Sequence, residues 1–140
     1  MSTVLWANLL ASGQVTCDES DKFALYKHTE KLDAIGRKLG LGSFLEICDT
    51  TDLRFNADEF ELPEGVESTN EVMATQGAWV DVEQAIKLLD GLLTHLGQNK
   101  VRFGLLSNDY EHVMSELSES LAYARTAQQS NAKFNFSVVT

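Results

Sequence analysis

The sequence predicts an α+β fold in which three main helices pack with a small, mostly antiparallel sheet. Segments at about 21–39, 81–97 and 109–128 place apolar residues three and four positions apart, as amphipathic helices do. Both ends of the chain alternate apolar and polar residues, as half-buried strands do. Because a lone strand leaves its backbone groups unpaired, the N-terminal and C-terminal strands should join one sheet, most simply with each other.

Length and composition favour one compact domain covering residues 1–140. At 140 residues with 44% hydrophobic content, a chain hides roughly two-thirds of its unfolded surface on folding. One proline and no Gly/Ser-rich run leave no evident linker to a second domain. The predicted domain includes an irregular acidic excursion at about 49–78.

The first elements are a strand in "TVLWANLLA" and a helix from about Asp21 to Leu39. Ser20 caps this helix and Gly40 follows its last turn. The spacing of its apolar stripe predicts that His28 is buried with its neighbours. The stripe consists of Leu25, His28, Leu32, Ile35 and Leu39.

A short helix capped by Ser43 is expected next, and periodicity then fails from Thr50 to Gln76. Pro63 and Gly65 supply turns within this segment. An irregular connection of this length is unusual inside a domain and is often functional when it is ordered. The segment is therefore the first place to look for a site.

Helical periodicity resumes over about 81–97, where Asp81 and Gln84 have the spacing of a capping box. The following "KVRFGLLS" fits either a short strand or an extended connector. A third long helix is predicted over about 109–128, and "KFNFSVVT" alternates as a terminal strand.

The formal charge of −10 is concentrated in one part of the chain. From Ser43 to Glu71 there are nine acids and one base, a net charge of −8. This charge argues against nucleic acid and anionic membrane as partners, because both attract Lys and Arg. No apolar run reaches about 18 residues, and no basic residue precedes the N-terminal apolar run. A soluble cytoplasmic protein is expected.

The sequence predicts no metal and no cofactor. Cys17 and Cys48 are not in a Cys-x-x-Cys pair, and no disulfide between them is expected. Calcium-loop registers that start at Asp49 or Asp52 lack the required oxygen ligands and glycine. Phosphate-binding loops, dinucleotide-binding turns and nucleophile elbows are also absent. No motif identifies a family whose activity could be transferred, and enzymatic activity is not expected.

The leading hypothesis is a protein-binding module, such as an inhibitor, an immunity-type neutraliser or an adaptor. A single-signed acidic face would steer association with a basic protein. Trp79 either locks a loop onto the core or, when exposed, anchors an interface. The sequence leaves the oligomeric state open. The candidate binding residues are Asp49, Asp52, Arg54, Asp58, Glu59, Glu61, Glu64 and Trp79.

The alternative hypothesis is a small-molecule-binding protein or an enzyme with a pocket between the sheet and the helices. A histidine and carboxylates perform acid–base chemistry once burial shifts their pKa values. No spacing forces these groups together, so the two hypotheses differ in whether the fold makes them converge. The pocket residues would be Tyr26, His28, Asp49 and Asp52.

Overall fold

The computed structural model describes residues 2–57 and 61–140, and it has the predicted α+β class. Within this part of the chain, one five-stranded sheet has the order β2-β1-β5-β3, and β4 also pairs with β5. The terminal strands β1 and β5 are antiparallel neighbours, as predicted, whereas β3 runs parallel to β5. The strands are β1 (Val4–Ala11), β2 (Gln14–Lys22), β3 (Cys48–Asp49), β4 (Val80–Asp81) and β5 (Lys133–Val139).

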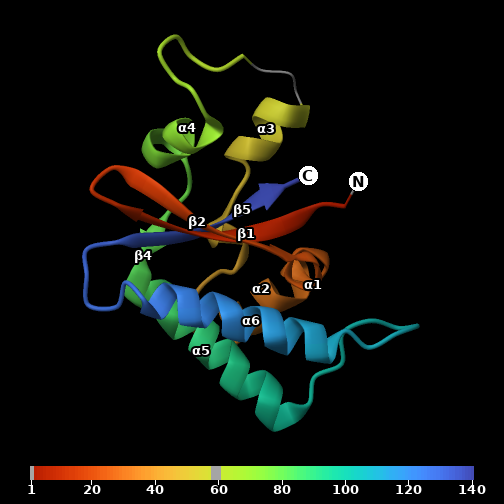
Figure 1. Ribbon diagram of the computed structural model, residues 1–140. Helices are drawn as coiled ribbons and strands as arrows, with labels where there is room; N and C mark the ends of the chain where they lie inside the picture. Colours follow the sequence, from red (N-terminus) through yellow and green to blue (C-terminus); the bar gives the residue numbers. More distant parts are fainter. Residues whose placement is uncertain (1, 58–60) are drawn as a thin grey trace.

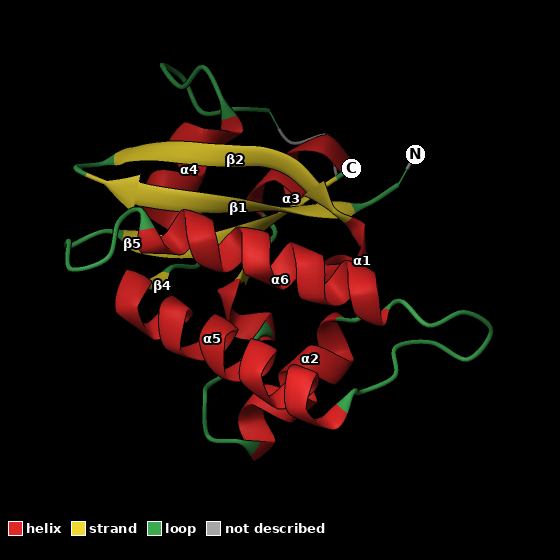
Figure 2. Ribbon diagram, turned by 60° about the horizontal axis from the view of Figure 1, so that its bottom comes forward, coloured by secondary structure: helices red, strands yellow, loops and turns green. Residues whose placement is uncertain are grey.

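Helices cover both faces of the sheet (Figure 1). The short pair α3 and α4 lies on one face, and α1, α2, α5 and α6 lie on the other (Figures 1 and 2). Among the helices of the described residues, none is both long and apolar enough to cross a membrane. The helices are α1 (Phe23–Lys27), α2 (Thr29–Lys38), the 3-10 turn η1 (Leu45–Ile47), α3 (Thr51–Ala57), α4 (Thr69–Gln76), α5 (Val82–Asn99) and α6 (Tyr110–Arg125).

Strands β1 and β5 present different side chains to the two faces of the sheet. On the face opposite the main core, Asn8 Nδ2 donates to Asn135 Oδ1 at 2.9 Å, and Asn135 Nδ2 donates to the Ala78 carbonyl at 2.8 Å. Because a one-residue slip would exchange the two faces, this alternation specifies the strand register. The core side of the two strands carries Leu5, Ala7, Leu9, Phe134, Phe136 and Val138.

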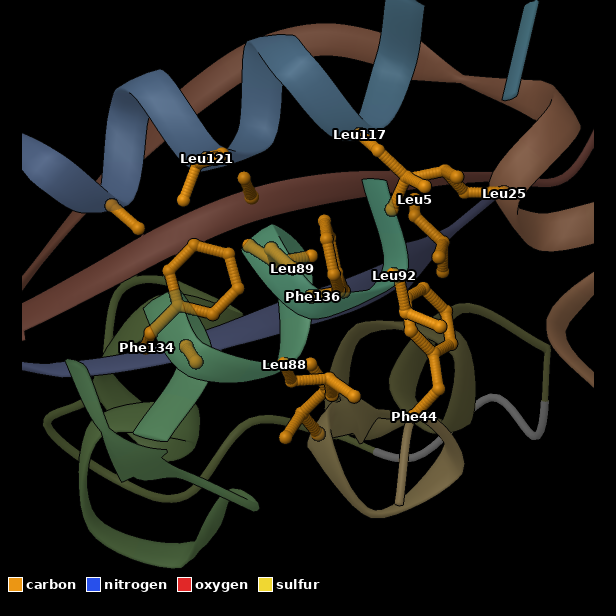
Figure 3. Packing of buried hydrophobic residues seen from close by; sticks show 14 of the residues in the cluster. Leu5, Leu25, Phe44, Leu88, Leu89, Leu92, Leu117, Leu121, Phe134 and Phe136 are labelled. Atoms are coloured by element: carbon orange, nitrogen blue, oxygen red, sulfur yellow. The ribbon is translucent and has the colours of Figure 1, made fainter. Parts of the chain in front are cut away.

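The main core lies between the sheet and the long helices α5 and α6. Leu89 of α5 lies beside the phenylalanines of β5, and Leu117 of α6 points toward Leu5 and Leu25 (Figure 3). Burying one leucine side chain stabilises a fold by about 1.5–3 kcal/mol, so α5 is a major source of stability. Its buried residues are Val82, Ala85, Ile86, Leu88, Leu89, Leu92 and Leu96.

The predicted single helix at 21–39 is wrong. Residues 14–22 form strand β2, and the remaining helix is interrupted at His28, which joins α1 to α2. The cause lies far away in the sequence. The Glu116 carboxylate of α6 accepts hydrogen bonds from the backbone N–H groups of Ala24, at 3.3 Å, and Leu25, at 3.0 Å. This carboxylate satisfies the N-terminus of α1, so the first helix begins there.

The prediction of an irregular excursion is wrong over 51–57 and 69–76, which form α3 and α4. Helix α4 begins with a capping box in which the Ser68 side chain accepts from the helix backbone and Glu71 accepts from the Ser68 backbone. It buries Val72 and Met73. Among the described residues, the irregular part between these helices is therefore limited to 61–68 and is shorter than expected.

Helices α5 and α6 confirm the remaining two predicted helices with changed ends. Asp81 precedes α5 but makes no side-chain capping bond, so the expected capping box does not form. The helix continues past Gly97 to Asn99 and ends where Lys100 adopts a left-handed conformation, with φ of 48°. The segment "KVRFGLLS" is a connector and not a strand.

Candidate protein-binding surfaces

Asp49, the first candidate in the chain, is a buried structural residue at the end of β3. Its carboxylate accepts from the backbone N–H and hydroxyl of Thr51 at 3.0 and 3.1 Å. It also accepts from the backbone N–H of Ala78 at 2.9 Å. The side chain is 3% exposed. Asp49 therefore starts α3 and ties it to the segment before β4, and it faces no partner.

Asp52 and Trp79 also make contacts inside the protein. The Thr69 hydroxyl donates to Asp52 Oδ1 at 2.8 Å, which joins α3 to α4. Trp79 is half-buried, and its Nε1 donates to the Met73 carbonyl at 2.8 Å. These contacts fit the first of the two roles expected for Trp79, which is to hold a loop against the rest of the protein. Arg54 is exposed on α3.

The exposed acids among the described candidates, Glu61 and Glu64, lie on the acidic turn, by which we mean residues 61–67. Asp58 and Glu59 lie outside the described residues. Within the turn, the Val66 N–H donates to the Pro63 carbonyl at 3.1 Å, and Gly65 has φ of 84°. Leu62 is 36% exposed among the acids. The turn thus combines negative charge with an apolar side chain. Its exposed carboxylates belong to Glu61, Glu64 and Glu67.

The residues of the alternative pocket lie in two separate places. Tyr26 and His28 line an open depression of about 530 Å³ next to α1 and α2. Asp49 and Asp52 lie across the sheet, beside α3 and α4 (Figure 1). A cavity on that side, which Asp52 lines, has a volume of about 40 Å³. Ligand pockets usually occupy about 300–1,000 Å³, so the space beside Asp52 is too small for one. The larger depression beside Tyr26 and His28 is open, and Asp49 and Asp52 do not line it, so the four residues do not form one pocket.

His28 takes part in an ion-pair cluster that holds α1 and α2 against the start of α6. Its Nε2 and the Lys27 Nζ each lie 2.8 Å from Asp109 Oδ2. Hydrogen bonds from Lys27 and then His28 lower the pKa of Asp109 to about 2. The His28 side chain is 11% exposed, close to the burial that the stripe predicted, whereas Leu39 of the same stripe is 40% exposed. The His28 ring meets Phe103 edge-on at 5.2 Å. The cluster is structural.

The described residues offer little evidence for a metal site or for a reactive thiol. No group of three or more His, Cys, Asp or Glu residues there is placed to hold a metal ion. Both cysteines are free thiols. Burial raises the pKa of Cys48 to about 12, with further contributions from Asp33 and Asp49. Burial also raises the pKa of Cys17, which accepts a hydrogen bond from Asn70.

The two thiols are expected to differ in reactivity. At about pH 8 a thiol with a pKa near 12 is almost entirely protonated, and the thiolate is the nucleophile. We expect Cys48 to react with a disulfide reagent at least about 100-fold more slowly than an exposed peptide thiol. Single Cys48→Ser and Cys17→Ser variants assign the two rates. Fast reaction of the thiol in the Cys17→Ser variant would contradict the burial of Cys48.

The most exposed apolar side chains lie on a segment that sequence reasoning did not select. We call residues 102–108, between α5 and α6, the leucine loop. Leu105 is 95% exposed and Leu106 is 103% exposed. The loop projects away from the helices in both views (Figures 1 and 2). Adjacent leucines outside any periodic segment were the sequence signal that could have identified it.

The leucine loop is held in one conformation by hydrogen bonds at its base. Arg102 donates from Nε to the Gly104 carbonyl at 2.8 Å and from Nη2 to the Leu105 carbonyl at 3.0 Å. The Asn108 side chain accepts from the Phe103 N–H at 2.9 Å. Gly104 has φ of 109°, and a Cβ there would collide with the Ser107 carbonyl. The loop therefore presents its leucines in a preformed arrangement.

The candidate site thus consists of two exposed segments, the acidic turn and the leucine loop. They belong to helical layers on opposite faces of the sheet (Figure 1). Lys31 and Lys100 lie at the base of the leucine loop, so the charges of the two segments differ in sign. Comparison with known proteins finds no family model, curated protein or solved structure that matches this chain.

Proposed function

We propose that this protein is a protein-binding module that docks on its partner through the leucine loop. The observation that carries the proposal is the exposure of Leu105 and Leu106, at 95% and 103%. Water contact of two adjacent leucines is unfavourable, and a partner's apolar surface removes it. Because the loop base is already hydrogen-bonded, little conformational entropy is lost on binding.

The acidic turn adds long-range electrostatic attraction to this short-range contact. With a net charge of −10, of which −8 lies between residues 43 and 71, the protein attracts a basic partner. The exposed carboxylates of the turn contribute to the encounter rate more than to the lifetime of the complex. An inhibitor, an immunity-type neutraliser or an adaptor would use the two segments in this way.

The test is a quantitative capture experiment with matched baits. We expect the double variant Leu105→Ser/Leu106→Ser to recover partners from a cell extract at least about tenfold less than wild type, since two apolar anchors are lost. The control, Leu45→Ser, removes a leucine that is 44% exposed elsewhere and should capture as wild type does. Equal recovery by all three baits would contradict the proposal.

A second set of baits separates steering from anchoring. Replacing Asp58, Glu59, Glu61 and Glu64 with Asn or Gln should slow association, and the difference should shrink as salt rises to about 0.5 M. The variant Leu105→Ser/Leu106→Ser should bind its partner weakly at low salt and at about 0.5 M salt alike, because salt does not screen apolar contacts. A charge variant that behaves as wild type at low salt would remove the acidic turn from the proposal.

A further inference from the structure

We infer that copies of this protein associate head to tail, with the leucine loop of one copy docked on the acidic turn of the next. The inference rests on the proposed function, because it uses the same loop, and it names a second copy of the chain as a partner. It is carried by the match in both charge and apolar character between the two segments.

On one side of the contact, the two leucines stand above a base that carries exposed cations. Lys31 Nζ donates to the Arg102 carbonyl and lies 5.1 Å from the centroid of the Phe103 ring. Lys100 Nζ lies 5.6 Å from the centroid of the Tyr110 ring. These contacts place the ammonium groups beside the loop, where they can meet carboxylates of a docked surface.

The acids near the leucine loop do not cancel this charge. Asp109 is paired with Lys27 and His28, each at 2.8 Å. Two further acids, Glu30 and Glu111, are exposed in the first turns of α2 and α6. The net charge is +1, in contrast to −8 over residues 43–71, when it is counted over Lys27, Lys31, Lys100, Arg102, Glu30, Asp109 and Glu111.

On the other side of the contact, the acidic turn interleaves apolar residues with glutamates along the sequence. Leu62 is 36% exposed, and Val66 is half-buried near it in sequence. The hydrogen bond between Val66 N–H and the Pro63 carbonyl, together with the left-handed Gly65, shapes the turn. Two leucines docked here would meet Leu62 and Val66 while Lys31 and Lys100 approach the acids. The carboxylates are those of Glu61, Glu64 and Glu67.

The two segments cannot pair within one molecule, because the sheet and its helical layers separate them. The acidic turn connects α3 to α4 on one face, and the leucine loop connects α5 to α6 on the other (Figures 1 and 2). A contact between two different surfaces is heterologous and repeats from copy to copy. It therefore produces a chain or a closed ring and does not stop at a two-fold dimer.

The contact is small, so the association is weak and reversible. Two leucines on a short turn bury much less than the roughly 1,200 Å² of a stable interface. We therefore expect a dissociation constant for self-association of about 10 to 500 µM. The average mass should rise from the 15.5 kDa of one chain as concentration increases, and it should fall when salt screens the charges.

Two variants, each defective on one side, test the head-to-tail arrangement. The loop variant, Leu105→Ser/Leu106→Ser, keeps an intact acidic turn. The turn variant, Leu62→Ser/Glu64→Lys, keeps an intact leucine loop. All four positions are exposed, so both variants should fold, which circular dichroism checks. Leu45→Ser is the matched control. Sedimentation velocity at low salt measures the masses.

Each variant alone should remain a monomer at concentrations where wild type and Leu45→Ser associate. An equimolar mixture of the loop and turn variants should form a dimer and nothing larger, because one functional contact remains and cannot repeat. Restoration by mixing is specific to a heterologous contact. A contact of two loops, or of two turns, would not recover in this way.

Four results would overturn the inference. They are a wild type that stays monomeric, a mixture that stays monomeric, variants that associate alone as wild type does, and loop-dependent binding to vesicles of neutral and anionic phospholipid without self-association. Suppose that wild type stays monomeric but the loop variant captures fewer partner proteins than wild type does. That result overturns self-association and leaves the proposed function intact. If wild type associates and captures no other protein, the second copy is the partner.

Discussion

Replacing Phe136 with alanine is expected to lower the free energy of unfolding by about 3–5 kcal/mol, because it removes a large side chain from a site that cannot collapse. Phe136 is 0% exposed on the central strand β5. Its ring lies 5.4 Å from that of Phe44 and 5.1 Å from that of Phe134 (Figure 3). Urea unfolding followed by circular dichroism measures the change.

The matched control for this substitution is Phe23→Ala. Phe23 is 44% exposed and its ring lies 5.1 Å from His112, so it makes fewer buried contacts. Its replacement should cost about 1 kcal/mol or less. Similar losses for the two variants would show that Phe136 is not at the centre of the core.

Replacing Asp49 with alanine is expected to cost about 2–4 kcal/mol, because it leaves one buried and one partly buried backbone donor without their acceptor. Thr51 N–H and Ala78 N–H both donate to this carboxylate. Asp49→Asn keeps one acceptor oxygen and should cost less. Glu61→Gln, on the exposed turn, should change stability by no more than about 0.5 kcal/mol.

This experiment also separates the structural role of Asp49 from a binding or catalytic one. A structural carboxylate affects unfolding without changing the behaviour of the folded molecules. If Asp49→Ala kept wild-type stability and lost partner capture, Asp49 would belong to the binding surface. Measuring both quantities on the same preparations decides between these outcomes.

Long amphipathic segments and terminal strands could be predicted because their patterns are local. The apolar stripe of α5 repeats over five turns, and this periodicity alone indicates which face of the helix is buried. The alternation around Phe134 and Phe136 likewise indicated β5. These elements bury the residues that the pattern names, so pattern and structure agree.

Other elements depend on contacts that no local pattern contains. Strand β2 is an edge strand with polar residues on both sides, and its pairing with β1 forms it. Glu116 binds the start of α1, and Asp109 binds His28 between α1 and α2, and both carboxylates are distant in sequence. Helix α4 was missed for another reason. Its capping pair, Ser68 and Glu71, is visible in the sequence, but its apolar residues show little periodicity.

The candidate site was only partly within reach of sequence reasoning. The negative charge of residues 43–71 could be predicted, because it depends on composition alone. Composition does not distinguish exposed carboxylates such as Glu61 and Glu64 from the buried Asp49, because burial depends on the fold. Leu105 and Leu106 are the same residue type as the core leucines. They are exposed because the chain turns away from the core at Gly104.

The central position of β5 has a consequence for the order of folding. Residues 133–139 pair with β1, β3 and β4, all of which precede them in the chain. During synthesis, the earlier strands emerge with their hydrogen-bonding groups toward β5 unpaired, and they stay so until β5 arrives. Such long-range pairing is slow, and exposed strand edges favour aggregation. This sheet is therefore most vulnerable to aggregation just before β5 leaves the ribosome.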